Sequence, residues 1–332
     1  MKRLLLSLIL FLSVHIQADP LFESEETLSI KLSADFSTLR REKNKSKEYQ
    51  TLLGFDDQQV PVTLKVRGNN RLKKCDSPPL RLILDKKEVK TTLFDNQSEL
   101  KLVVPCKKGK KYLEYVRLEY LIYQIYRLFS EDSFRVRWLA VTYDNDGEIT
   151  TGPGFFIERK KRLAKRRNME SVKQPRIGID QLQPVAAARV SAFMYLVGNL
   201  DFSILQASAG DGDCCHNVKL MKPENTESGF VPVPYDFDSA GLVNPPYATP
   251  PSVVDVSSVR VRRYRGFCEH KTQVAEFLSE VLTRKKEITS LIEQDAYLSD
   301  RSKSRATSYL NRFFDLAENP KRRDKQIISA CR

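Results

Sequence analysis

The spacing of apolar residues changes partway along this chain of 332 residues, and that change limits the folds open to it. Residues 60–66 (VPVTLKV) alternate apolar and other side chains, as a half-buried strand does. Similar runs predict further strands at 28–32, 79–84, 99–104, 135–143 and 154–158. Residues 112–129 instead carry apolar side chains at helical spacing, so one helix interrupts the run of strands.

The second half of the chain is predicted to be mainly helical. Residues 185–200 are apolar along most of their length, as in a buried helix, whereas 272–293 and 302–318 have the pattern of amphipathic helices. A short strand is expected at 230–235. Strands followed by helices favour an α+β fold or two lobes, with a boundary near residues 159–180.

The N-terminus has the layout of an export signal. Lys2 and Arg3 precede an apolar stretch from Leu4 to Val14, and the segment then turns polar and reaches Ala18. We expect a signal peptide over residues 1–18, cleaved near Ala18, and a periplasmic or secreted protein with no transmembrane span afterwards. An uncleaved anchor is the alternative, although an apolar run of about eleven residues is short for a membrane span.

Six cysteines follow this segment, and an even number after an export signal predicts disulfides. Cys75–Cys106 is the first expected pair, because both residues lie near the ends of predicted strands. Cys214 and Cys215 are adjacent, so we expect them to pair with Cys268 and Cys331 rather than with each other. Zinc at the sequence Cys214-Cys215-His216 is the rival interpretation, although the usual two-residue gap between cysteines is missing.

The chain is basic, with 55 Lys and Arg against 42 Asp and Glu and a formal net charge of +13. Loss of Lys2 and Arg3 with the signal would leave +11, since residues 1–18 contain no acidic residue. Residues 159–167 (RKKRLAKRR) hold seven basic residues in nine. This run predicts binding of an anionic polymer or an anionic substrate, or is a solvated charged segment.

Candidate catalytic and metal-binding residues gather in the second half. Asp201 ends the apolar helix in GNLDFS, Asn217 lies in CHNVKL, and Asp236 and Asp238 follow a predicted strand in PYDFD. Carboxylate and amide oxygens are the ligands that hard divalent cations prefer. Turn and cap roles are the common alternative for each residue alone.

Phosphoryl-transfer enzymes use these residue types in the same order. They need an Asp for the nucleophile, a downstream Asn and a further Asp for metals, and a strand Lys paired with a Glu on the next helix. Lys101 and Glu119 occupy the last two positions in this chain. Lys65 and Arg81, also on predicted strands, are alternatives to Lys101.

Three segments resemble the spore-coat CotH-type atypical protein kinases. The first is Arg67-Gly68-Asn69 followed by PPLRLIL, and the second is the helix YVRLEYLIYQIYRLF with the strands RVRWLAVTY and GPGFFIER. The third is GNLDFS, then HN, then VPYDFDSAGL, which is similar to the family's Asp, Asn and metal-binding motif. The similarity covers roughly residues 60–245.

This resemblance implies a two-lobed, protein-kinase-like α+β fold, with a β-rich N-lobe at 19–160 and an α-rich C-lobe at 161–332. It also implies a role for each matching residue. Asp201 would be catalytic, Asn217, Asp236 and Asp238 would hold Mg2+ or Mn2+, and Lys101, Glu119 and Glu158 would bind ATP, with Glu158 at the hinge between lobes. The acceptor would be a protein or a small molecule, and transfer of a nucleotidyl or glutamyl group is a related activity.

Two other classes were compared with this interpretation. A Ser/His/Asp hydrolase is disfavoured, because the chain lacks G-x-S-x-G and offers only His216 and His270 after the signal. A non-catalytic envelope protein that binds a polyanion or a protein partner through its basic surface remains the alternative to a transferase.

Overall fold

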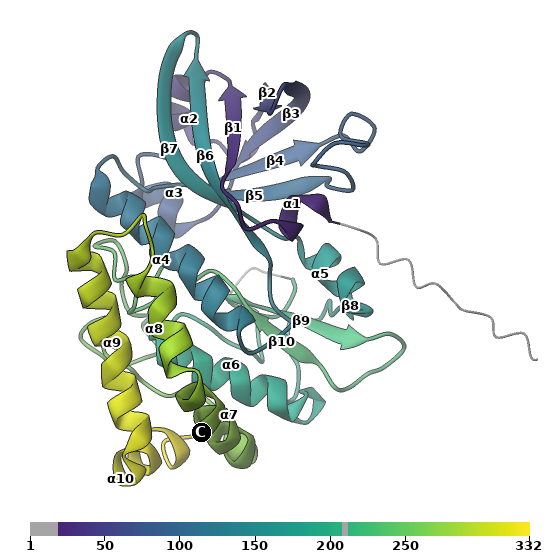
Figure 1. Cartoon of the computed structure of the whole chain (residues 1–332). Helices are drawn as coiled ribbons and strands as arrows, with labels where there is room; N and C mark the ends of the chain where they lie inside the picture. Colours follow the sequence, from purple (N-terminus) through teal and green to yellow (C-terminus); the bar gives the residue numbers. More distant parts are fainter. Residues whose placement is uncertain (1–18, 208–211) are drawn as a thin grey trace, which may run out of the picture.

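The computed structural model describes residues 19–207 and 212–332, so the expected signal peptide at 1–18 lies outside the described residues. Seven strands dominate the first half (Figure 1). They are β1 (Leu28–Ser33), β2 (Glu48–Phe55), β3 (Gln58–Val66), β4 (Leu80–Leu84), β5 (Glu99–Val103), β6 (Val136–Asn145) and β7 (Glu148–Ile157). The helices among them are α1 (Pro20–Glu23), α2 (Phe36–Glu42), α3 (Asn70–Lys74) and α4 (Lys110–Arg127).

The seven strands form a closed barrel in the order β1-β2-β3-β4-β5-β7-β6. Neighbours pair antiparallel, except that β1 and β6 run parallel from Leu28 opposite Leu139 to Ser33 opposite Asp144. The expected alternation in β3 is confirmed, because Val60, Val62, Leu64 and Val66 are buried inside the barrel. Closure leaves no open edge, since each edge strand pairs with the other.

The prediction of a two-lobed protein-kinase-like fold is therefore wrong. The structure has a closed, mixed, seven-stranded barrel, a separate small sheet and, in the described residues, ten α-helices. The parallel pairing of β1 with β6 joins segments about a hundred residues apart and converts the row of strands into a barrel. The order of strands before helices survives, but the architecture does not.

The second half of the chain surrounds one long buried helix, α6 (Pro184–Val197). A small sheet has the order β10-β9-β8, with β8 at Met169–Ser171, β9 at Val218–Pro223 and β10 at Val231–Pro234. The remaining helical segments are α5 (Lys160–Arg166), η1 (Ile179–Gln181), η2 (Cys268–His270), α7 (Lys271–Thr283), α8 (Lys285–Glu293), α9 (Asp300–Glu318), α10 (Pro320–Arg323) and η3 (Asp324–Ile328). The helix expected at 272–293 is thus two helices that meet at Arg284.

Helix α4 joins the two halves (Figure 1). Its aromatic rings reach both ways, because Tyr120 contacts Trp138 of β6 and Tyr126 contacts Phe193 of α6. Arg117 of the same helix lies over the rings of Trp138 and Tyr297 and pairs with buried Asp295 at 2.7 Å. This helix therefore fixes the position of the barrel relative to the elements that follow it.

Three disulfides link the six cysteines, and the expected Cys75–Cys106 pair is confirmed. The other pairing is wrong, because Cys214 bonds to adjacent Cys215 and Cys268 bonds to Cys331. Backbone hydrogen bonds between Cys268 and Arg332, and between Arg332 and Gly266, hold the last pair together. With both cysteines oxidised, Cys214 and Cys215 are not thiolate ligands for zinc. Three disulfides are consistent with a periplasmic or extracellular location.

None of the helices in the described residues is long and apolar enough to cross a membrane.

Candidate functional site

A cleft of about 480 Å3 lies where the barrel meets the segment that follows β10. Its charged lining has two parts. The basic residues are Arg67, Arg71, Arg81 and Lys101, which come from β4, β5, α3 and the turn between β3 and α3. The acidic residues are Glu119, Asp201, Asp236 and Asp238, from α4 and the second half. We call these two sets the basic wall and the acidic wall.

The basic wall follows from strand alternation. Leu100 and Leu102 of β5 are fully buried in the barrel core, so Lys101 between them points outward into the cleft. Arg81 of β4 is its partner across the strands. Burial and the nearby charges of Arg67 and Lys219 lower the pKa of Lys101 to about 7. The Lys101 ammonium also lies 4.7 Å from the centre of the Tyr235 ring.

A tight turn after β3 brings a second arginine to the cleft. Gly68 has a φ of +87°, which suits glycine, and α3 begins two residues later. Arg71 of α3 donates a hydrogen bond to the Val104 carbonyl, and its Nε lies 3.9 Å from Asp238 Oδ2. The disulfide after α3, with hydrogen bonds from Asp76 and Ser77 to Cys106, holds this short helix against the barrel.

The acidic wall depends on a buried phenylalanine. Phe237 is fully buried and packs against Tyr123 at 4.8 Å and Phe193 at 6.0 Å, so Asp236 and Asp238 on either side of it both line the cleft. Asp236 has a left-handed φ of +62°, and its backbone N–H donates to Tyr123 Oη at 2.9 Å. Burial and the adjacent Asp236 carboxylate raise the pKa of Asp238.

Asp201 is positioned by the end of α6. Gly198 caps that helix with a φ of +69°, and a side chain there would collide with Tyr309. Buried Asn199 then joins the two acidic segments, because its Oδ1 accepts from the Asp201 N–H at 3.0 Å and its Nδ2 donates to the Asp236 carbonyl at 3.4 Å. Asn199 was not among the residues predicted from the sequence.

Both carboxylate oxygens of Asp201 are engaged. Oδ1 lies 2.7 Å from His216 Nε2, and Oδ2 accepts from Asn217 Nδ2 at 3.2 Å. Asn217 Nδ2 also donates to the Asp201 carbonyl at 2.7 Å. Because the amide nitrogen of Asn217 is used in this way, its Oδ1 is directed away from Asp201. The side-chain amide of Asn217, 16 residues after Asp201, therefore holds the Asp201 carboxylate in place.

Glu119 lies in the cleft with Lys101, but the two do not form an ion pair among the described residues. Glu119 is 3% exposed, and the charges that act on it most strongly are those of Asp238 and Arg71. Burial and repulsion by Asp238 raise the pKa of Glu119 well above its usual value.

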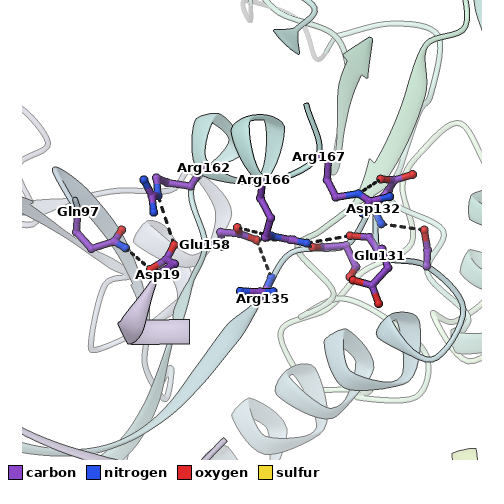
Figure 2. A network of polar contacts seen from close by, with 11 residues as sticks. Asp19, Gln97, Glu131, Asp132, Arg135, Glu158, Arg162, Arg166 and Arg167 are labelled. Carbon is purple, nitrogen blue, oxygen red and sulfur yellow. Dashed lines mark hydrogen bonds and ion pairs between the residues drawn. The ribbon is translucent and has the colours of Figure 1, made fainter. Parts of the chain in front are cut away.

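Glu158 lies outside the lining of this cleft, in the polar network of Figure 2. Its two oxygens accept hydrogen bonds from Arg166 Nε and Nη2, each at 3.0 Å, and Oε2 also accepts from the Arg135 N–H at 3.0 Å. Glu158 is 2% exposed, so these contacts use its carboxylate fully. The arrangement is that of a structural ion pair at the end of β7.

Ion pairs neutralise most of the basic run, and three of them belong to the network of Figure 2. Ion pairs engage five of its seven basic residues: Arg159 with Glu99, Lys160 with Asp213, Arg162 with Asp19, Arg166 with Glu158, and Arg167 with Asp132. Leu163 and Ala164 of α5 are buried. The segment is therefore a packed helix with compensated charge, and it offers less to a polyanion than its composition suggests.

The carboxylate and amide oxygens of the cleft suit a hard cation that takes its remaining ligands from water or substrate. Across residues 19–207 and 212–332, no group of three or more His, Cys, Asp or Glu side chains is arranged to hold a metal ion by itself. Asp236, Asp238 and the Asn217 amide nevertheless line one cleft. Mg2+ commonly binds through one or two carboxylates and completes its shell with water and substrate phosphates, so this oxygen set suits it.

Comparison with known protein families and with curated proteins found no match for the chain. The structure brings Lys101, Glu119, Asp201, Asn217, Asp236 and Asp238 to one cleft. Arg71 and the role of His216 beside Asp201 were missed. The placement of His216 directly before Asn217 was a usable signal, whereas nothing local to α3 marks Arg71.

Proposed function

We propose that this protein uses the cleft to transfer a phosphoryl or related group from a nucleotide, bound with Mg2+ or Mn2+, to a hydroxyl acceptor. The observation that carries the proposal is the pairing of the two walls. Four cationic side chains face four carboxylates across a single cavity of about 480 Å3. Phosphoryl transfer depends mainly on positioning and on charge stabilisation, and it needs both kinds of group.

The basic wall would hold the phosphates. Arg81 and Lys101 project from the paired strands β4 and β5, and Arg67 directly follows β3, so the barrel gives these donors a rigid support. Burial, together with the nearby charge of Arg67, disfavours the charged form of Lys101 and lowers its pKa. A bound triphosphate would relieve this repulsion and favour the charged lysine.

The acidic wall would hold the cation and receive the acceptor. Asp236, Asp238 and Asn217 would be the protein ligands of Mg2+ or Mn2+, and the bound cation would offset the charge of the phosphates. Asp201 would accept the proton of the acceptor hydroxyl. His216 and Asn217 hold its carboxylate in place and so act as positioning residues. Glu158 has no part in this proposal because its carboxylate is used elsewhere.

The proposal rests on the side chains of the cleft and not on a kinase fold, since the barrel departs from that architecture. The resemblance to CotH-type kinases supplies the same roles for Asp201, Asn217 and Asp236. We further propose that the chain is processed near Ala18 and acts in the periplasm or outside the cell. Transfer there requires a source of nucleotide in that compartment.

A thermal shift experiment tests the proposal. The oxidised protein is heated with Mg-ATP, with Mn-ATP, with ATP alone and with metal alone. Stabilisation that requires nucleotide and metal together is expected, and a ligand present at 100 times its Kd should add about 2.7 kcal/mol to the free energy of unfolding. Asp236→Asn should lose this stabilisation, because asparagine keeps the left-handed backbone but not the charge.

Asp146→Asn is the matched control. Asp146 also has a left-handed φ, of +52°, but it lies in the exposed turn between β6 and β7. It should retain the full shift. Equal shifts in Asp236→Asn and in the unsubstituted protein would refute the assignment of the metal site.

A further inference from the structure

A second cavity of about 490 Å3 adjoins the cleft on the far side of Asp201. The two cavities share Asp201, His216 and Pro251 in their linings. A group placed in the second cavity can therefore reach the same carboxylate that faces the nucleotide cleft. We call this second cavity the acceptor pocket.

The acceptor pocket has an apolar interior. Phe202, Leu205 and Phe267 line it, and Phe202 and Phe267 are almost fully buried. Val253, also in the lining, is 78% exposed and is the most exposed large apolar side chain in the described part of the chain. An apolar side chain this exposed at the edge of a pocket suits a ligand that extends beyond the pocket itself.

Two arginines supply the charge of the acceptor pocket. The guanidinium of Arg265 lies 5.2 Å from the centre of the Phe202 ring, and that of Arg332 lies 5.3 Å from the centre of the Phe267 ring. Arg265 Nη1 also donates to the carbonyls of Leu200 and Phe202, which fixes its position. In the described residues, neither guanidinium has a carboxylate within 4.0 Å. Burial and the charge of Arg332 lower the pKa of Arg265, and the carboxylate of Asp201 acts in the opposite direction.

These observations point to an anion beside a hydroxyl. We propose that the acceptor pocket binds an acidic peptide segment, with a Ser or Thr hydroxyl at Asp201 and a neighbouring Glu or Asp carboxylate between Arg265 and Arg332. Charge complementarity carries the choice, since two guanidinium groups line one pocket and, in the described part of the chain, neither has a carboxylate within 4.0 Å. Because exposed Val253 at the edge of the pocket suits a ligand longer than the pocket, a peptide is favoured over a compact hydroxy acid.

The inference rests on the proposed function for its chemistry. The hydroxyl oxygen of the peptide forms a bond to the terminal phosphorus of a nucleoside triphosphate, and the bond from that phosphorus to the bridging oxygen breaks. The hydroxyl proton passes to the Asp201 carboxylate. The products are a phosphopeptide, a nucleoside diphosphate and one proton.

Binding of peptide is measured first, without nucleotide, so that it does not depend on transfer. A fluorescent Ser peptide with two Glu residues after the Ser is compared by anisotropy with the same peptide carrying Gln. The Glu peptide should bind at least about tenfold more tightly at low salt, the effect of one charge-assisted contact. Arg332→Gln should reduce this preference to twofold or less. Arg301→Gln, which removes an exposed arginine of α9 instead, should leave it unchanged.

Phosphorylation of the two peptides, and of free serine, is then measured with Mg-ATP. The Glu peptide should be the better substrate of the unsubstituted protein. The Arg332→Glu variant should instead prefer the same peptide with Lys in place of the two Glu residues. Equal binding of Glu and Gln peptides, or phosphorylation of free serine but of neither peptide, would overturn the inference. Preference for the Glu peptide without any Mg-ATP stabilisation would overturn the proposed function while sustaining the pocket.

Discussion

Asn217 Nδ2 donates hydrogen bonds to the backbone carbonyl of Asp201 at 2.7 Å and to its carboxylate at 3.2 Å. The two residues are 16 positions apart, on either side of a loop that carries the Cys214–Cys215 disulfide. One amide thus ties the proposed proton acceptor to the proposed metal site. The proposed reaction requires the proton acceptor and the metal site to keep a fixed position relative to each other.

Asn217→Asp tests this tie. The substitution keeps a residue that accepts the left-handed φ of +50°, but it removes the donor and places a second carboxylate against Asp201. We expect the transfer rate to fall at least about tenfold, since loss of a hydrogen bond to a charged group costs about 1.5–3 kcal/mol and the repulsion adds to it. Asn225→Asp, at an exposed left-handed position, is the control and should transfer normally. An unaltered rate in Asn217→Asp would contradict the account.

Gly198→Ala should destabilise the protein more than a left-handed conformation alone explains. Both Gly198 and Gly229 have positive φ, but an added Cβ would collide with Tyr309 at Gly198 and would meet nothing within 4 Å at Gly229. Gly229→Ala should cost about 1 kcal/mol from backbone strain. Gly198→Ala should cost at least about 1 kcal/mol more, because Tyr309 or the cap must move. Urea unfolding measures both, and equal costs would argue against a rigid cap before Asp201.

Lys101 predicts a pH dependence of nucleotide binding. Its pKa of about 7 lies below that of an unfolded lysine, so the unfolded chain binds more protons than the folded protein between about pH 7 and 10.5. Lys101 therefore makes the ligand-free protein more stable as the pH rises through this range. Bound phosphate should raise that pKa, and the protein should therefore take up a proton when it binds ATP at pH 8. Titration calorimetry in two buffers with different ionisation enthalpies measures the uptake.

Lys101→Met should lose that proton uptake. Lys65→Met, on strand β3 beyond β4 and outside the cleft, should keep it. Uptake that is the same in Lys101→Met and in the unsubstituted protein would place the titrating group elsewhere.

The Cys75–Cys106 disulfide should matter for binding as well as for stability. Replacing both cysteines by Ser removes a bridge across 31 residues, which is worth about 4 kcal/mol in the chain-entropy account. It should also weaken Mg-ATP stabilisation, because α3 and Arg71 lose their anchor. The Cys268→Ser/Cys331→Ser variant removes a bridge across 63 residues and should lose comparable stability, yet keep nucleotide binding. Similar losses of binding in both variants would contradict this division.

The local elements were predictable because each depends on a local pattern. The alternation in β3 and the buried helix α6 both follow from side-chain periodicity. Barrel closure was not predictable in this way, because the pairing of Leu28 with Leu139 is set by tertiary contacts and leaves no signature in either segment. The Cys268–Cys331 pair was missed for the same reason, whereas Cys75–Cys106 was predicted correctly.

The acidic wall was visible in the sequence and the basic wall was only partly so. A D-x-D pair around an apolar residue after a strand places both carboxylates on one side, as Phe237 shows. Arg71 lies near Asp238 because two features orient α3: the turn at Gly68 and the disulfide from Cys75 to Cys106, which is 31 residues away in sequence. Glu158 was predicted to bind ATP, whereas its carboxylate pairs with Arg166. That contact was not predictable, because Arg166 lies in a run whose sequence is typical of solvent-exposed charge.

The most direct test of the central claim is a crystal structure of the oxidised protein with Mn2+ and a non-hydrolysable ATP analogue. The account predicts an anomalous manganese peak bound to the Asp236 carboxylate, with the phosphates against Lys101 and Arg67. Nucleotide density elsewhere, or a manganese peak with no oxygen from Asp236 or Asp238 in its shell, would contradict it.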